Sequence, residues 1–190
     1  LRSQTDGTWS ATGGGSWPLP ANWIGGIQAG GTDAVADFST RNITATRTIT
    51  LDGPRTIGTL RFGDGPSAPA DITHDQILSA GTGDPLTMDT GNGRARIENR
   101  NRTTTLGVVL AGDDGISISN GTGGGGSVIL TAANTFTGGL DIAGTVVQLN
   151  HKARPELIGA TLLDSFARTA EDRQVFDLSF GPRVLGGMYL

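Results

Sequence analysis

The side chains with the most obvious catalytic potential are the two histidines, His74 and His151, which stand far apart in the sequence. A nucleophilic triad needs a histidine beside a buried aspartate and a serine on a strained turn, and the chain contains no Gly-x-Ser-x-Gly elbow. Neither histidine has partners at the spacing of zinc ligands. We therefore predict that neither histidine is catalytic.

Aspartate pairs are the stronger candidates, because enzymes that cleave polysaccharides place two carboxylates across a cleft. The closest pairs in the sequence are Asp113 with Asp114, Asp84 with Asp89, and Asp33 with Asp37. Each pair stands in or beside a turn-like stretch, where aspartate is favoured because its side chain bonds to the local backbone. The pattern favours a structural role for all of them and predicts no catalytic residue.

Ligand-binding motifs are also missing from the sequence. The stretch 121–126 (GTGGGG) is not a phosphate-binding loop, because no Gly-Lys-Ser/Thr follows and a strand-like run comes next. The repeated calcium-binding nonapeptide is absent, and AGDDG occurs once. With no cysteine there is no thiolate ligand, nucleophile or disulfide. We predict no cofactor-binding and no metal-binding residue.

The composition indicates a β protein with many turns. Glycine supplies 31 of 190 residues, and the hydrophobic 36% falls in short alternating runs, which disfavours long helices. The net charge of −4 shows no excess of basic residues that would bind phosphates, so we expect no nucleic-acid partner. No run of about 18 apolar residues occurs, so we expect no membrane insertion of this segment.

Short strand-like runs separated by Gly, Asp and Asn turns fill the middle of the chain. They are 43–51, 56–62, 71–78, 85–88, 94–100, 103–110, 115–119, 127–131, 140–142 and 146–149. Such runs occur in sandwiches, barrels and solenoids, and their alternation alone does not choose among these folds.

The segment 123–150 (GGGGSVILTAANTFTGGLDIAGTVVQLN) is more specific. Its motif positions are Val128 and Leu130, the turn 134–139 (NTFTGG), Ile142, Gly144-Thr145 and Leu149. In this pattern the segment resembles the autotransporter-associated β-strand repeat of bacterial surface proteins. It departs from the family at Ala132, where glycine is usual, and at Val146-Val147, which is one residue longer than the family spacing. The extra residue predicts either a bulge or a change in which valine points inward.

The resemblance implies an all-β fold, a right-handed parallel β-helix. In such a solenoid we expect four side chains to point inward, namely Ile49, Leu51, Leu60 and Phe62. Their neighbours Thr48, Thr50, Thr59 and Arg61 are expected to face solvent. Asn134 is expected at a corner, where it joins an asparagine ladder or bonds its own turn.

The two ends differ from this middle. Residues 1–40 hold Trp9, Trp17 and Trp23 and are expected to cap the β-helix of residues 41–150; a platform for sugar rings is the alternative. Residues 151–190 suggest a short helix, from Ile158, Leu162 and Phe166, followed by strands. The alternative is a strand in place of that helix. We also expect the parent protein to continue beyond residue 190.

Taken together, these features predict a structural or adhesive protein on the bacterial cell surface, outside the cell, and not an enzyme. The expected partners are host or environmental surfaces, surface glycans, and further copies of the chain. Head-to-tail filaments would form if the terminal segments docked onto a neighbour instead of their own chain. The alternative is a polysaccharide-active or carbohydrate-binding β-helix, suggested only by fold analogy.

Overall fold

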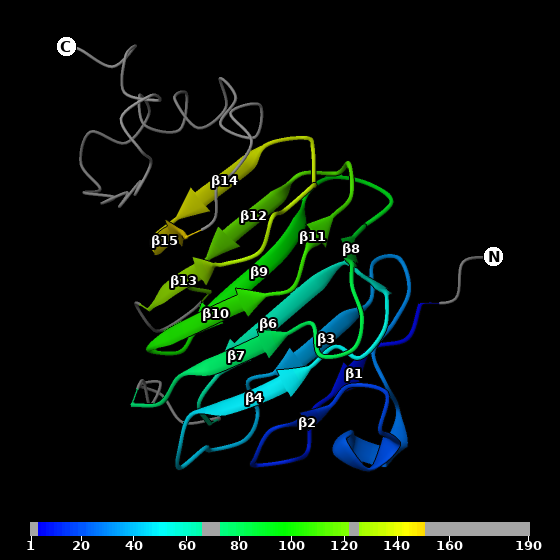
Figure 1. The fold of residues 1–190 in the computed structure, drawn as a ribbon, viewed down its shortest axis with the longest axis vertical. Helices are drawn as coiled ribbons and strands as arrows, with labels where there is room; N and C mark the ends of the chain where they lie inside the picture. The colour runs from blue at the N-terminus through cyan, green and yellow to red at the C-terminus, as the bar shows by residue number, and fades with distance from the viewer. Residues whose placement is uncertain (1–3, 66–72, 122–125, 151–190) are drawn as a thin grey trace.

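The computed structural model describes residues 4–65, 73–121 and 126–150, and almost all regular structure in them is β-strand in three parallel sheets (Figure 1). Sheet I consists of β1 (Gly7–Thr8), β3 (Val35–Phe38), β6 (Thr59–Gly63), β9 (Ala95–Arg100), β12 (Ile116–Ser119) and β14 (Leu140–Ala143). Sheet II consists of β2 (Gly15–Ser16), β4 (Arg47–Thr50), β7 (Gln76–Ser79), β10 (Thr103–Gly107), β13 (Ser127–Leu130) and β15 (Val146–Leu149). Sheet III consists of β5 (Arg55–Ile57), β8 (Leu86–Met88) and β11 (Leu110–Ala111).

From β4 to β12 the chain visits the sheets in the order II, III, I, and each visit adds one strand beside the previous one. Thus β4, β5 and β6 form one coil, and β7, β8 and β9 form the next. The named strands pair in parallel, which antiparallel sandwiches and up-and-down barrels do not do. The expectation of a parallel β-helix is confirmed.

Stacked aliphatic side chains from successive coils form the core. In sheet II, Ile49, Leu78, Leu106 and Leu130 are partners in register and are all buried. Sheet I repeats this arrangement along a buried row of Ala36, Leu60, Ile97, Ile118 and Ile142. Each coil therefore covers the apolar face of the coil before it, which no single coil could bury alone.

The inward positions predicted from alternation are correct, since Ile49, Leu51, Leu60 and Phe62 are fully buried. The outward prediction is wrong for Thr59, whose exposed fraction is 8%. Thr59 lies in an outward row, between Val35 and Arg96 on the neighbouring strands. The larger side chains of these two register partners flank the short threonine, so it loses contact with solvent.

Two predicted strands turn out to cross a corner between sheets. The run 56–62 is divided into β5 and β6 at Gly58, where an added Cβ would lie 2.6 Å from Asp33 Cα. The run 103–110 is divided in the same way, into β10 and the first residue of β11. A corner inside an apolar run leaves the alternation intact, so the sequence pattern alone did not reveal it.

The three tryptophans pack together at the N-terminal end of the coil. Trp9, Trp17 and Trp23 are at most 2% exposed, and their rings lie 5.2–5.7 Å from the ring of Phe38. Phe38 stacks in turn on Phe62 at 5.3 Å. Two 3₁₀ turns, η1 (Pro20–Asn22) and η2 (Ile24–Gly26), carry the chain around Trp23.

The repeat-like segment follows the same coil geometry. Val128 pairs with Val147, and Leu130 pairs with Leu149, without a break in register. Val147 is 2% exposed, so it is the valine that points inward, and β13 and β15 pair without a bulge. The short helix predicted within 151–190 lies outside the described residues. Within those residues, no helix is long and apolar enough to span a membrane.

Candidate functional site

Polar side chains are buried at the corner where the chain passes from sheet I into sheet II. The first inward position of sheet II is polar in three successive strands, occupied by Arg47, Gln76 and Thr104. In the next two strands the same position is apolar, occupied by Val128 and Val147. We call Arg47, Asp64, His74, Gln76, Asn99 and Thr104 the polar corner.

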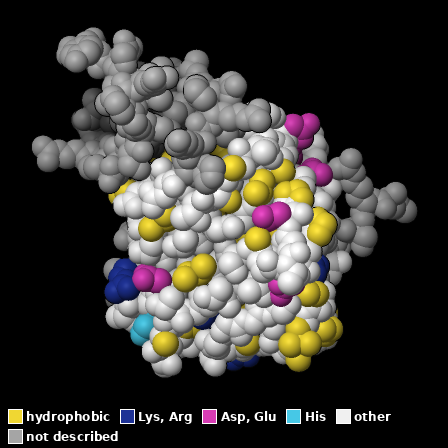
Figure 2. Space-filling view, viewed as in Figure 1, with side chains coloured by type: hydrophobic (Ala, Val, Ile, Leu, Met, Phe, Trp, Pro, Cys, Tyr) yellow, Lys and Arg dark blue, Asp and Glu magenta, His cyan; other side chains and the backbone are white. Residues whose placement is uncertain are grey.

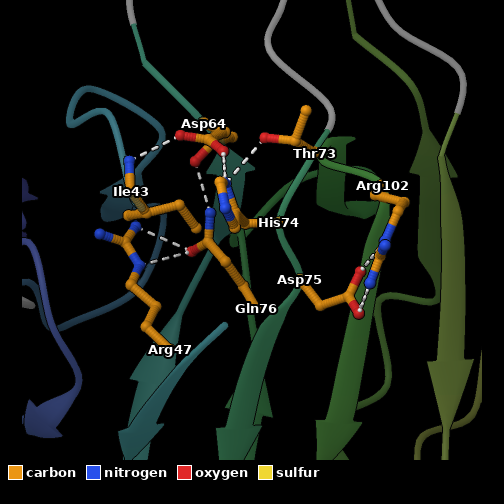
Figure 3. Close-up of polar contacts among 9 residues, drawn as sticks. Ile43, Arg47, Asp64, Thr73, His74, Asp75, Gln76 and Arg102 are labelled. Atoms are coloured by element: carbon orange, nitrogen blue, oxygen red, sulfur yellow. Dashed lines mark hydrogen bonds and ion pairs between the residues drawn. The ribbon is translucent and has the colours of Figure 1, made fainter. Parts of the chain in front are cut away.

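Arg47 is 2% exposed, and its guanidinium is held by several acceptors. Its Nε and Nη2 donate to Oε1 of Gln76 at 3.1 and 2.8 Å (Figure 3). Nη1 donates to the Ala11 carbonyl at 3.2 Å. Nη2 also donates to the Phe38 carbonyl. Burial lowers the pKa of Arg47 to about 10, although the Asp64 carboxylate opposes this shift.

Asp64 and His74 form the one arrangement in this corner that resembles catalytic machinery. Asp64 is 1% exposed and accepts a hydrogen bond from the Ile43 N–H at 2.6 Å. Its Oδ2 lies 3.0 Å from Nδ1 of His74, and Thr73 Oγ1 lies 2.8 Å from the same nitrogen (Figure 3).

This geometry does not make a proton relay. In a triad the aspartate holds one ring nitrogen while the opposite nitrogen takes the proton of the nucleophile. Here the carboxylate and the hydroxyl both face Nδ1, so the Thr73 hydroxyl does not lie at the nitrogen opposite the carboxylate, where a triad holds its nucleophile. The sequence reasoning missed the Asp64–His74 pair, because the two residues lie on opposite sides of a corner. His151 lies outside the described residues.

The next coil continues the polar corner with neutral groups. Asn99 Nδ2 donates to the Ser127 carbonyl at 3.0 Å, and its Oδ1 accepts from Thr104 Oγ1 at 2.9 Å. The same Oδ1 accepts from the Asn101 N–H at 3.1 Å. The side chains of Asn99 and Thr104 are thus occupied by backbone groups and by each other, which fits a structural role.

The aspartate pairs singled out from the sequence also bond to backbone. Asp114 Oδ2 accepts from the Thr90 N–H at 2.7 Å, and Asp84 Oδ1 accepts from the Val109 N–H at 3.1 Å. Asp89 Oδ1 accepts from the Gly91 N–H at 2.8 Å, and Asp37 Oδ1 accepts from the Ser39 N–H at 2.8 Å.

The remaining members of these pairs are exposed. Asp33 occupies a turn with a φ of 65°, and Asp113 lies in the turn before β12. In the part of the chain that the structure describes, no group of three or more metal-ligating side chains comes together. One carboxylate or both of each pair thus bonds to backbone at a corner, namely those of Asp37, Asp84, Asp89 and Asp114.

Asn134 has a partner that the sequence did not indicate. Its Oδ1 accepts from the Leu110 N–H at 2.9 Å, so it bonds to the preceding coil and not to its own turn. Asp84 makes the same kind of bond from the other side, to Val109. At this corner short polar side chains of the neighbouring coils accept hydrogen bonds from the Val109 and Leu110 N–H groups at the start of β11.

Two charged contacts lie closer to solvent. Asp75 accepts two hydrogen bonds from Arg102, at 2.8 and 2.6 Å, and this pairing lowers the pKa of Asp75 (Figure 3). Asp52 accepts from Ser16, Thr50 and the Thr82 N–H, and these bonds hold its pKa below the usual range. Both carboxylates join neighbouring coils.

Comparison with known proteins gives one informative relative. The chain is 30% identical over 147 residues to the adhesin BmaC autotransporter of Brucella suis biovar 1 (strain 1330). The match covers 77% of this chain and 4% of the relative, so the chain corresponds to a small part of that protein. No family model matches the sequence. No solved structure matches it either. The chain is thus similar to part of an autotransporter adhesin.

Proposed function

We propose that this chain is a non-catalytic, adhesive segment of a bacterial surface protein. The single observation that carries the proposal is the similarity to the autotransporter adhesin, which extends over most of a chain that winds as a parallel β-helix. The polar groups are consistent with it, since the carboxylates of Asp37, Asp84, Asp89 and Asp114 each accept a hydrogen bond from a backbone N–H.

The carbohydrate-binding alternative is less well supported. Stacking on sugar rings needs an exposed aromatic face, and all three tryptophans are packed into the N-terminal cap. Enzymatic action on polysaccharide would release new reducing ends. We expect none when the chain is incubated with a panel of neutral and acidic polysaccharides, and their appearance would overturn the non-catalytic part of the proposal.

Adhesion can be tested with beads that carry the purified chain at a fixed density. We expect such beads to stay on epithelial-cell monolayers or on matrix-protein films under flow, well above uncoated beads. The matched control is Leu78→Asp, which places a charge in the stacked core and so removes the folded surface with little change in composition. Equal retention of the two proteins would contradict a folded adhesive surface.

A further inference from the structure

Two Asn-Gly dipeptides lie in turns of the β-helix, Asn92-Gly93 between β8 and β9 and Asn120-Gly121 directly after β12. The side-chain amide of an asparagine can react with the backbone nitrogen of a following glycine, because glycine has no side chain to obstruct the approach. The two dipeptides have the same composition. A difference in their reactivity in the folded chain therefore reports a difference in their surroundings.

Asn92 and Gly93 stand clear of the other coils. Residues 91–93 are exposed and form a bend between the two strands. Gly93 has a φ of 90°, and a Cβ added to it would meet no atom within 4 Å beyond its chain neighbours. The backbone nitrogen of Gly93 and the side-chain amide of Asn92 thus lie in open surroundings that water reaches.

Asn120 is more closely surrounded. Its Oδ1 is buried, and its Nδ2 would lie 3.7 Å from a Cβ added at Gly144 in the next coil. Gly121 is covered on one side by the guanidinium of Arg100, since an added Cβ would lie 2.9 Å from Arg100 Nε. The side-chain amide of Asn120 must therefore leave its place before it reacts, and such local opening costs free energy.

We propose that Asn92 is a site of spontaneous deamidation, where the folded chain gains a carboxylate. The Gly93 backbone nitrogen attacks Asn92 Cγ. The new N–Cγ bond forms, the Cγ–Nδ2 bond breaks, and ammonia leaves with the proton from the Gly93 N–H. Water, the one co-reactant, then opens the cyclic imide. Its attack at Cγ gives aspartate, whereas its attack at the Asn92 carbonyl carbon breaks the bond to Gly93 and gives isoaspartate.

The reaction changes the charge of the corner between sheets III and I. It adds one negative charge to a chain whose net charge is −4. Two carboxylates already bond to this turn, since Asp114 Oδ2 accepts from the Thr90 N–H at 2.7 Å and Asp89 Oδ1 accepts from the Gly91 N–H at 2.8 Å. Figure 2 shows how sparsely charged side chains are spread over one face of the molecule. A third carboxylate at a single turn concentrates negative charge there.

Site-resolved mass spectrometry of the full chain tests the proposal. Trypsin separates the two sites, because Asn92 falls in the peptide that ends at Arg94 and Asn120 in the peptide that begins at Thr103. During incubation of the folded chain at neutral pH, we expect conversion of amide to acid at least about fivefold faster at Asn92, because Asn120 must first open locally. Equal conversion at the two sites, or faster conversion at Asn120, would overturn the proposal.

Concentrated urea supplies the control for local sequence. Unfolding removes the contacts that distinguish the two dipeptides, so we expect their two rates to approach each other in the unfolded chain. An undiminished preference for Asn92 in urea would contradict the role assigned to the fold, because the residues next to each dipeptide in the sequence would then account for it.

A variant gives an independent readout by ion-exchange chromatography. Asn92→Gln keeps an amide but lengthens the side chain, which disfavours ring closure, so we expect the acidic form that builds up in the native chain to be nearly absent. Asn150→Gln is the matched control, since Asn150 is exposed but is followed by His151. This control should build up the acidic form like the native chain. Unchanged build-up in Asn92→Gln would contradict the assignment to Asn92.

Discussion

The first inward row of sheet II changes character along the β-helix. In β4, β7 and β10 the row is Arg47, Gln76 and Thr104, and in β13 and β15 it is Val128 and Val147. The backbone geometry is the same throughout, since the register is unbroken. The difference shows that a β-helix interior accepts polar residues where a corner supplies partners, and needs aliphatic residues where it does not.

The two halves therefore depend on different interactions. Around Arg47 the carbonyls of Ala11 and Phe38 and the side chain of Gln76 replace the water that burial removes. Around Val128 the row contributes to stability only by burying apolar surface. Substitutions along this one row should separate the two cases.

Arg47→Ala should have the largest effect. The variant leaves Asp64 without its nearby positive charge and leaves Gln76 Oε1 without its donors, and breaking a buried charge network typically costs about 3–5 kcal/mol. Urea unfolding measures the change in the free energy of unfolding. Arg96→Ala, at an exposed position of β9, is the control and should change stability by about 0.5 kcal/mol or less. A similar small change for Arg47→Ala would show that the network contributes little.

Val128→Thr should have the next largest effect on the free energy of unfolding. It keeps the shape of the side chain but buries a hydroxyl in the apolar part of the row, at an expected cost of about 1–3 kcal/mol. Equilibrium denaturation again gives the value. If the variant were as stable as the native chain, the apolar coils would tolerate polar groups as well as the corner does.

The reverse exchange, Thr104→Val, should lower the free energy of unfolding by less, about 0.5–1.5 kcal/mol. Its hydroxyl is one of two donors to Asn99 Oδ1, and the Asn101 N–H remains after the exchange. Comparing Val128→Thr with Thr104→Val tests the same change of atoms in both directions. A greater loss for Thr104→Val than for Val128→Thr would reverse the expected order.

Acid should produce the smallest effect, through Asp75. Its pairing with Arg102 lowers its pKa in the folded chain, so its contribution is present above the unfolded pKa of about 3.9 and is lost as the pH falls through the folded pKa. Asp75→Asn should therefore flatten part of the decline in the urea midpoint as the pH falls below about 5. An unchanged decline would mean that Asp75 contributes nothing to it.

Some features of the β-helix could be predicted from the sequence and others could not. Stacking positions such as Ile49 and Leu60 were predictable, because alternation along a strand fixes which side chains face inward. The division of the run 56–62 was not, because the corner at Gly58 depends on how closely Asp33 of the previous coil approaches. Local pattern determines the strands, whereas contacts between coils determine where they end.

The polar corner was hidden for the same reason. Alternation places Arg47 on the inward side with Ile49, but its partners Ala11, Phe38 and Gln76 come from distant parts of the sequence. The pair of Asp64 with His74 likewise forms across a corner. A single sequence carries no signal for contacts made between coils, beyond the presence of an arginine in a β-rich run.

The β-helix depends on the register between strands of adjacent coils, and pairs of introduced cysteines test this register most directly. Thr48 and Ile77 are register partners on adjacent strands of sheet II, and Thr105 lies one strand further. Neighbouring parallel strands are about 4.8 Å apart, within the span of a disulfide, whereas two strand spacings exceed the limit of about 7 Å. In dilute protein, we predict that Thr48→Cys with Ile77→Cys forms an intramolecular disulfide and that Thr48→Cys with Thr105→Cys does not. Ready closure of the second pair, or failure of the first, would contradict the winding described here.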